Sequence, residues 1–272
     1  MNDNRSTPVV CCDLDGVYWR GDQPLAGAAA GDAALRGAGF RVGYLSNNSS
    51  QPVGEVTEKL RAMGVDAGPD DVITSAVAAA ALLARDLPAG APVLTCAGPG
   101  VTEALLAVGL EPRRDGPVDA VVVGFHRDFD FDGLARASAA VRAGARFVAT
   151  NLDATYPVPA AEGGLVPGAG AIVAAVATAS GRRPEVAGKP EAPVVELVRA
   201  RLGTHGVVVG DRPSTDGALA TNLGWPFALV LSGVTRDPAP PGGESIPDPA
   251  PPFVADDLAA LAPMLVRALT SS

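Results

Sequence analysis

The stretch that decides the fold is Val9-Val10-Cys11-Cys12-Asp13-Leu14-Asp15-Gly16-Val17-Tyr18, an apolar run followed by two carboxylates and a glycine. The apolar run predicts a buried strand, and the residues after it predict the carboxyl edge of a parallel sheet, where α/β proteins bind ligands. Side chains two positions apart in an extended chain point the same way. Asp13 and Asp15 would therefore crowd each other unless a proton or a metal ion relieves their repulsion. The alternative is an ordinary turn, because Asp and Gly are common after a strand.

Outward from this stretch, short apolar runs alternate with Ala-rich segments. Besides residues 9–12, the predicted buried strands are residues 40–45, 93–96, 118–123, 146–149, 207–209 and 227–231. The predicted helices are residues 27–38, 53–63, 74–85, 101–108, 132–143, 169–179, 192–201 and 256–269. Such alternation is typical of βαβ units, so the sequence predicts an α/β fold with a central parallel sheet.

Composition excludes several classes of protein. The chain has 272 residues, of which 47% are hydrophobic and 19% charged, and its net charge of -9 goes with a pI near 4.7. A disordered chain would be poorer in apolar residues, and an acidic chain argues against a broad basic face for a nucleic acid polymer or a membrane. Residues 76–87 carry Arg85 and Asp86 and fall short of the ~20 residues that a membrane span needs.

The three cysteines are predicted to be buried free thiols, and no signal-peptide pattern is visible. Both features lead us to expect a cytoplasmic protein.

Three further polar motifs follow or precede predicted elements. Ser46-Asn47-Asn48 follows residues 40–45, Gly188-Lys189-Pro190 precedes a helix, and Gly210-Asp211 ends a strand five residues before Asp216. A hydroxyl, an amide and free backbone N–H groups suit a phosphate, although Ser and Asn are also ordinary helix caps. Asp216 could equally be a simple helix N-terminal charge.

Lysine is rare in this chain, which has only Lys59 and Lys189 among its basic residues. Lys189 suits a phosphate or a carboxylate cluster because its ammonium is a compact point charge. Lys59 follows Glu55 by four residues, and we expect these two to form a solvated helical pair. Together, the carboxylates, the lysine and the hydroxyl/amide motif suit Mg²⁺ and a phosphate.

The motifs in this order resemble the haloacid dehalogenase (HAD) superfamily of phosphatases, in particular its C2-capped branch of p-nitrophenyl phosphatases, phosphoglycolate phosphatases and NagD-like proteins. The resemblance implies a Rossmann-like core with an inserted α/β C2 cap domain. The polar motifs lie in residues 13–50 and 189–216, with few between. We therefore expect a discontinuous core of residues 1–77 and 183–272, and a cap of residues 78–182. Residues 237–252, rich in Pro and Gly, are expected to form a surface loop.

The same resemblance implies roles for individual residues. Asp13 would be the nucleophile that forms an aspartyl-phosphate, and Asp15 the general acid and then the general base. Ser46, Asn47 and Lys189 would hold the phosphate, and Lys189 would also be catalytic, bridging Asp13 and the phosphoryl group. Mg²⁺ would be held by Asp13, Asp211 and the backbone carbonyl of Asp15, with Asp216 supporting them. Substrate specificity is expected in the cap, at residues Phe125, His126, Asn151, Asp153 and Tyr156.

The leading hypothesis is a Mg²⁺-dependent phosphomonoesterase for a small phosphorylated metabolite. The candidate substrates are glycerol phosphate, phosphoglycolate, p-nitrophenyl phosphate and nucleotide monophosphates. A phosphotransferase or mutase on the same fold, or a non-catalytic phosphate-binding module, are the alternatives. A nucleotide-binding oxidoreductase is less favoured, because Ala97-Gly98-Pro99-Gly100 lacks the full dinucleotide fingerprint. A homodimer is possible.

Overall fold

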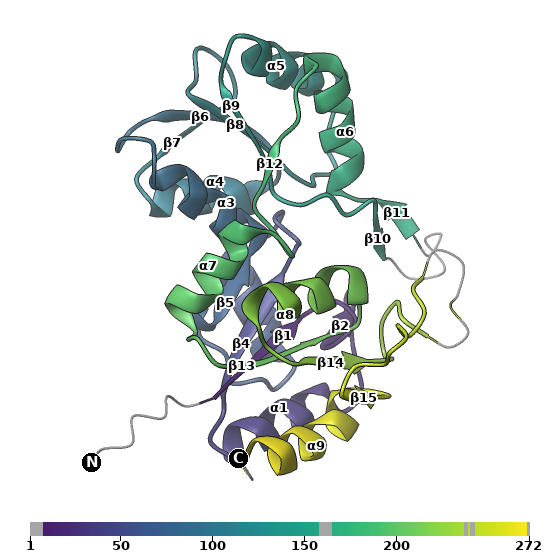
Figure 1. The fold of residues 1–272 in the computed structure, drawn as a ribbon. Coiled ribbons are helices and arrows are strands. Elements are labelled where there is room, and N and C mark those ends of the chain that lie inside the picture. The colour runs from purple at the N-terminus through teal and green to yellow at the C-terminus, as the bar shows by residue number, and fades with distance from the viewer. Residues whose placement is uncertain (1–7, 158–164, 237–238, 240–242, 271–272) are drawn as a thin grey trace. The chain divides into compact units, whose positions relative to one another are not determined.

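A computed structural model describes residues 8–157, 165–236, 239 and 243–270, and the chain forms two compact units (Figure 1). The first unit comprises residues 1–46, 57–73 and 198–272, and the second comprises residues 47–56 and 74–197. The second unit therefore holds the middle of the chain. The predicted boundaries of core and cap, after residues 77 and 182, stay a prediction.

The first unit is built on a six-stranded sheet in the order β15-β14-β13-β1-β4-β5. Its strands are β1 (Val9–Asp13), β4 (Arg41–Ser46), β5 (Val72–Thr74), β13 (Gly206–Gly210), β14 (Phe227–Val230) and β15 (Phe253–Ala255). Strand β1 pairs in parallel with β4 and β13, and β14 pairs in parallel with β13 and β15. The prediction of an α/β fold with a central parallel sheet is confirmed.

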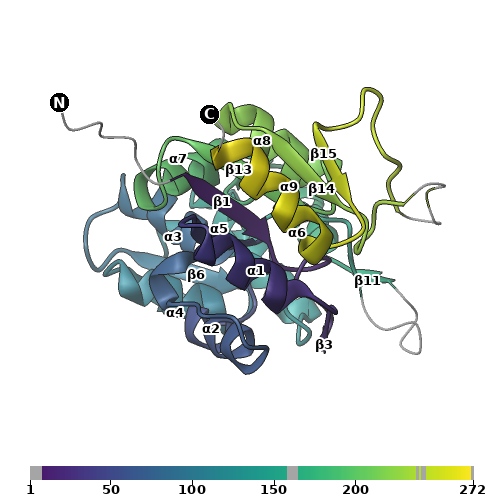
Figure 2. The ribbon, with the colours of Figure 1, turned by 90° about the horizontal axis from the view of Figure 1, so that it is seen from below.

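Two helices from opposite ends of the chain lie side by side on one face of this sheet. They are α1 (Ala28–Gly37) and α9 (Leu258–Thr270), drawn in purple and yellow in Figure 2. The helices approach closely at Gly31, where an added Cβ would overlap the backbone of Leu258. A short helix, α8 (Ala218–Leu223), contacts β13. Helices α2 (Val53–Ala62) and α7 (Ala192–Arg201) have residues in both units, and a 3₁₀ turn covers Pro69–Asp71.

A tight turn and a small hairpin follow β1. The hairpin pairs β2 (Trp19–Arg20) with β3 (Gln23–Pro24) in antiparallel fashion. The turn depends on Gly16, whose φ of 84° lies in the left-handed region that favours glycine.

The second unit has a five-stranded parallel sheet in the order β12-β9-β8-β6-β7. Its strands are β6 (Pro92–Cys96), β7 (Glu111–Arg113), β8 (Ala120–Val123), β9 (Arg146–Ala149) and β12 (Glu185–Val186). Helices α5 (Phe131–Arg142) and α6 (Ala169–Ser180) lie on one face, and α3 (Ser75–Ala84) and α4 (Pro99–Ala107) on the other (Figure 1). A hairpin pairs β10 (Thr155–Pro157) with β11 (Leu165–Pro167).

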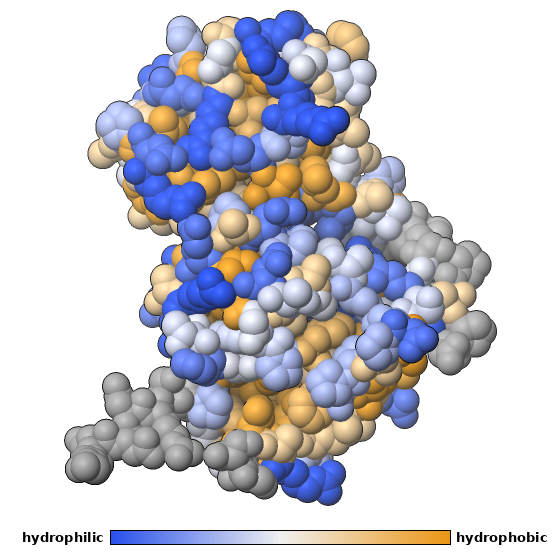
Figure 3. Space-filling view, viewed as in Figure 1, coloured by the Kyte–Doolittle hydropathy of each residue, from blue (hydrophilic) through white to orange (hydrophobic). Residues whose placement is uncertain are grey.

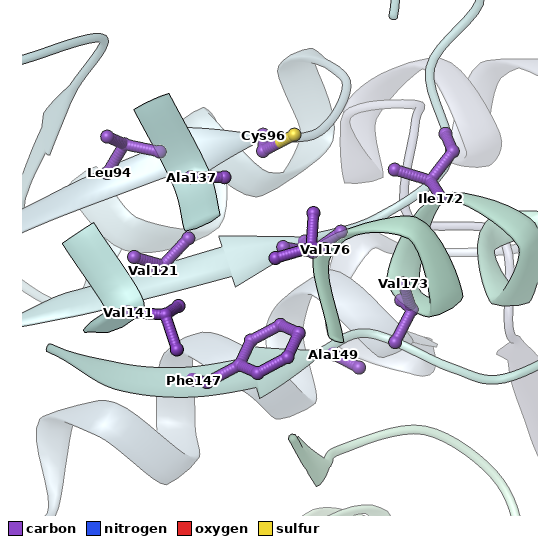
Figure 4. Close-up of a cluster of buried hydrophobic side chains, with 11 residues drawn as sticks. Leu94, Cys96, Val121, Ala137, Val141, Phe147, Ala149, Ile172, Val173 and Val176 are labelled. Carbon is purple, nitrogen blue, oxygen red and sulfur yellow. The ribbon is translucent and has the colours of Figure 1, made fainter. Parts of the chain in front are cut away.

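Small aliphatic side chains fill the core between this sheet and helices α5 and α6. Figure 4 shows Val121 and Phe147 from the strands facing Val141 and Val176 from the helices. Because such residues bury apolar area in few rotamers, they explain how a chain with 4% aromatic residues builds a core.

The helices start where the sequence offers a cap or a proline. Thr74 accepts a hydrogen bond from the Val77 N–H at the start of α3, and Asp130 accepts one from Gly133 at the start of α5. Helix α4 begins with Pro99 in its first turn, where a missing N–H costs nothing.

Most elements fall within two residues of their predicted positions. Helix α7 and strand β9 have the same bounds as the predicted ranges of residues 192–201 and 146–149. The prediction of buried free cysteines is confirmed at Cys11, Cys12 and Cys96. Of the predicted loop at residues 237–252, five residues lie outside the described ones. The rest form no helix or strand apart from an isolated bridge at Glu244.

Hydrophilic and hydrophobic residues interleave over both units on the face shown in Figure 3. Among the described residues, no helix is long and apolar enough to cross a membrane.

Candidate active site

Three carboxylates gather at the carboxyl edge of the sheet in the first unit. Asp13 ends β1, and Asp211 and Asp216 follow β13; one oxygen from each lies within 4.8 Å of the others. Asp211 is 4% exposed and Asp216 is fully buried. The strand register explains the meeting, because Cys12 is level with Val209 in neighbouring parallel strands.

Two glycines make room for these carboxylates. A Cβ on Gly16 would overlap the carboxylate of Asp211, and a Cβ on Gly210 would overlap that of Asp216. Glycine is therefore required at both positions by close approach, and at residue 16 also by its backbone conformation.

Backbone N–H groups fix the two carboxylates that follow β13, one from a loop later in the chain and one from the turn that carries them. Asp211 Oδ2 accepts a hydrogen bond from the Val234 N–H at 2.6 Å, and Asp216 Oδ2 accepts one from Arg212 N–H at 3.1 Å. Ser232 Oγ donates to the Gly16 carbonyl at 2.6 Å, which ties the same loop to the turn after β1. Backbone donors thus hold the carboxylates of Asp211 and Asp216.

Asp15 is not a member of this carboxylate group among the described residues. Its Oδ1 accepts a hydrogen bond from the indole N–H of Trp19 at 3.0 Å. The ammonium of Lys59 lies 4.2 Å from the centre of the Trp19 ring and donates to the Gly21 carbonyl at 2.7 Å. The expectation that Lys59 forms a solvated pair with Glu55 is wrong. The side chain of Lys59 instead places its ammonium over the Trp19 ring, whose face attracts a cation.

A buried polar network braces the same turn from the helix side. The Asp32 carboxylate in α1 is 1% exposed and accepts hydrogen bonds from Tyr18 and Tyr44 hydroxyls, both at 2.8 Å. Arg36 Nε donates to Asp32 at 3.1 Å. Burial, followed by the nearby acidic groups, raises the pKa of both tyrosines above their usual range. Both hydroxyls therefore stay protonated and able to donate.

In the second unit, the side chain of Asn47 is bonded to the backbone of Lys189. Asn47 Oδ1 accepts from the Lys189 N–H at 2.8 Å, and Nδ2 lies 3.3 Å from the Lys189 carbonyl and 3.1 Å from the Asp153 carboxylate. These bonds occupy the amide of Asn47, which the sequence predicts as a phosphate ligand. The side chain of Lys189 is buried, at 6% exposure.

The loop that carries Asn47 is fixed by two more donors. The backbone carbonyl of Asn47 accepts hydrogen bonds from Ser75 Oγ and from Asn151 Nδ2, each at 2.6 Å. Asn151 Oδ1 in turn accepts the Asp153 N–H at 3.0 Å. The bonds of Asn151 and Asp153 favour a structural role, whereas the sequence predicts that they select the substrate.

The other predicted specificity residues are aromatic and partly buried. Phe125 stacks on Tyr156 with ring centroids 5.7 Å apart and planes inclined by 24°. His126 meets Phe129 edge to face, and its Nδ1 lies 3.0 Å from the Gly124 carbonyl. The stacked rings offer an apolar surface. The role of Phe125, His126 and Tyr156 in specificity stays a prediction.

Sequence reasoning missed Trp19, Asp32 and Ser75. Asp32 did carry a signal, because it is a lone acid on the apolar face of an Ala-rich helix. The bond from Trp19 to Asp15 lies in a turn outside any helix, so no repeating pattern of apolar residues in the sequence predicts it.

The donor set of the carboxylate group fits a hard divalent cation. Three carboxylates this close repel one another, and a cation relieves the repulsion. An all-oxygen set of few protein ligands matches Mg²⁺, which keeps several of its own waters.

Comparisons with known proteins agree with these motifs. A model described as haloacid dehalogenase-like hydrolase matches residues 10–111, and one described as HAD-hydrolase-like matches residues 186–261. D-glycerol 3-phosphate phosphatase of Mycobacterium tuberculosis is 42% identical over 226 residues, which cover 82% of this chain and 62% of that protein. Acid sugar phosphatase of Staphylococcus epidermidis is 37% identical over 82% of this chain and 86% of its own length.

Solved structures give the same result. The glycerol phosphate phosphatase of Mycobacterium tuberculosis in complex with magnesium has a TM-score of 0.82 and 37% identity, covering 94% of this chain and 77% of that one. The p-nitrophenyl phosphatase of Archaeoglobus fulgidus has a TM-score of 0.85 and 30% identity, covering 96% of this chain and all of that one (100%).

Proposed function

Because the chain belongs to the haloacid dehalogenase-like hydrolase family, we propose that it is a Mg²⁺-dependent phosphatase of small phosphorylated metabolites. The observation that carries the proposal is the group of Asp13, Asp211 and Asp216 at one sheet edge. The named phosphatases among its relatives support the same reaction class.

Asp13 and Asp211 would hold Mg²⁺, with Asp216 beside them and the Asp15 backbone carbonyl as a further ligand. A bound Mg²⁺ supplies positive charge that offsets the repulsion between a carboxylate nucleophile and a phosphate ester. The magnesium complex of the mycobacterial relative supports this choice of ion.

The proposed chemistry uses Asp13 and Asp15 in two steps. In the first, an oxygen of Asp13 bonds to phosphorus as the bond between phosphorus and the leaving oxygen breaks. The leaving oxygen keeps the electron pair of that bond and receives a proton from Asp15. In the second, water gives a proton to Asp15 and attacks phosphorus, and the bond to Asp13 breaks. Inorganic phosphate leaves, and both carboxyl groups return to their starting states.

Ser46 and Lys189 are the proposed phosphate-holding side chains. Ser46 ends β4, the strand next to β1, and Leu45 is level with Asp13 in the sheet. Lys189 would offset charge on the phosphoryl group, and donors placed before the reaction lower its barrier most. The Asn47 side chain is bonded elsewhere, so we assign phosphate contact to its backbone N–H.

The proposed substrates are polyol or sugar phosphates, by analogy with the glycerol phosphate and acid sugar phosphatases. Phosphoglycolate, p-nitrophenyl phosphate and nucleotide monophosphates stay candidates. Cytoplasmic location, a homodimer and the capping role of residues 78–182 stay predictions.

The test is hydrolysis of p-nitrophenyl phosphate and of a panel of sugar, glycerol, glycolate and nucleotide phosphates, with Mg²⁺ and with a chelator. We expect Mg²⁺-dependent release of inorganic phosphate, abolished in Asp13→Asn and retained in Asp66→Asn, a change at an exposed acid. Phosphate delivered to a second metabolite would instead indicate a phosphotransferase. Phosphate binding without release from any ester would indicate a binding module.

A further inference from the structure

Trp19 is attached to the turn after β1 in three ways. Its indole N–H donates to Asp15 Oδ1 at 3.0 Å, its backbone carbonyl accepts from the Gly16 N–H at 2.7 Å, and it forms a β-bridge with Asp15. The side chain is 3% exposed. The single donor group of this buried indole is therefore bonded to a carboxylate.

Lys59 holds the ring from the other side. Its ammonium lies 4.2 Å from the ring centre, donates to the Gly21 carbonyl at 2.7 Å and is 3.6 Å from Asp22 Oδ1. A cation at this distance from a tryptophan face is attracted to it, and the bond to Gly21 anchors the same cation to the hairpin. The ring is thus fixed between α2 and the turn.

We propose that Trp19 is a positioning residue for Asp15, with Lys59 securing Trp19. The inference rests on the proposed function, in which Asp15 gives a proton to the leaving alcohol. An indole N–H can only donate, so its bond to Oδ1 restrains the orientation of the Asp15 carboxyl group. Trp19 thereby restrains the rotamer of Asp15.

The contact itself is tested by NMR of the indole N–H groups, which requires no activity. The chain has two tryptophans, Trp19 and Trp225, and Trp225 donates its N–H to the Thr204 carbonyl at 2.9 Å. Trp225→Phe assigns the two signals. In Asp15→Ala we expect the Trp19 signal to shift and the Trp225 signal to stay, whereas Asp66→Ala should move neither. An unmoved Trp19 signal in Asp15→Ala would overturn the inference.

The effect on the reaction is tested with Trp19→Phe, which keeps a ring under Lys59 and removes the donor. Trp225→Phe is the matched control, because it removes another buried indole donor, 7% exposed, that bonds the Thr204 carbonyl. The measured quantity is kcat/KM, which reports the steps up to loss of the alcohol. It is compared for glycerol phosphate, whose alkoxide needs a proton to leave, and for p-nitrophenyl phosphate, whose phenolate does not.

For Trp19→Phe we expect kcat/KM to fall about 10- to 100-fold on glycerol phosphate and less than about threefold on p-nitrophenyl phosphate. Trp225→Phe should change neither value. Equal losses on both esters would show that Trp19 only supports the fold, and unchanged values on both would show that it does not position Asp15. If the unaltered protein hydrolyses no ester, the proposed function fails, while the NMR result still decides whether the two side chains are bonded.

Discussion

At the residue scale, the side chain of Asn47 is hydrogen-bonded to the backbone of a residue far along the chain. Its amide pairs with both backbone polar groups of Lys189, and its Nδ2 also reaches Asp153. The Asn47 amide bonds the Lys189 backbone as a neighbouring strand would, and it thereby fixes the backbone position of Lys189.

Replacing Asn47 by alanine is expected to weaken both stability and catalysis. The change removes the hydrogen bonds to the Lys189 backbone and to the partly buried Asp153 carboxylate, which costs about 2 kcal/mol of unfolding free energy. A displaced Lys189 should lower kcat/KM about 10- to 100-fold. Chemical denaturation and steady-state kinetics measure the two effects. The exposed Asn222→Ala is the control, and equal behaviour of the two variants would contradict the assigned role.

Gly16 gives a second prediction at this scale, with Gly39 as its match. Both glycines have positive φ, 84° and 89°, so alanine strains the backbone equally at either position. An added Cβ meets nothing within 4 Å at Gly39 but overlaps Asp211 at Gly16. We expect both alanine variants to lose about 1 kcal/mol from backbone strain, and Gly16→Ala alone to lose Mg²⁺-dependent hydrolysis. Equal activity in the two would show that the close approach to Asp211 is unimportant.

At the scale of single elements, helix α1 joins the turn after β1 to strand β4 through one buried carboxylate. Asp32 binds Tyr18 from the turn and Tyr44 from the strand, and both tyrosines have raised pKa values. Folding therefore favours their neutral forms. This contribution to stability is complete below the ordinary tyrosine pKa of 10.0 and is lost as the pH rises above it.

Asp32→Ala is expected to destabilise the first unit. Breaking a buried charged network by removing one partner costs about 3 kcal/mol, since Arg36 and two hydroxyls lose their acceptor. Thermal and denaturant unfolding measure the loss, and Asp66→Ala controls for removal of an exposed acid. A change below about 0.5 kcal/mol in Asp32→Ala, as is usual for surface substitutions, would contradict this account of α1.

Strands β1 and β6 carry the cysteines, and their burial predicts inert thiols. Burial raises the pKa of Cys96 to about 11 and moves that of Cys12 upward as well. At pH 8 few of these groups are thiolates, so a thiol-reactive dye should label the native protein slowly. Denaturation should release three reactive thiols per chain. Rapid labelling of the native protein at pH 8 would contradict the buried placement.

At the scale of the whole molecule, the long strands could be predicted from the sequence because each buried run is continuously apolar. The short strands could not, since two or three residues show no periodicity and several contain proline or charge; they are β2, β3, β5, β7, β10, β11, β12 and β15. Helix α8 was also missed, because its residues Thr221 and Asn222 break the apolar pattern.

Part of the site could likewise be predicted from the sequence and part could not. The carboxylates at strand ends could be predicted, because parallel register brings those ends together whatever the loops do. The partners of Asn47 could not, because Asp153 and Lys189 lie 106 and 142 residues away and only folding brings them near. Local pattern determines which groups reach the sheet edge, and long-range packing determines what holds them.

The central claim is that Asp13 and Asp211, with Asp216 beside them, hold one divalent cation, and calorimetric titration with Mg²⁺ tests it most directly. We expect one ion per chain in the unaltered protein, an affinity at least about tenfold weaker in Asp211→Asn, and unchanged binding in Asp66→Asn. Undiminished Mg²⁺ affinity in Asp211→Asn, or no binding by the unaltered protein, would contradict it.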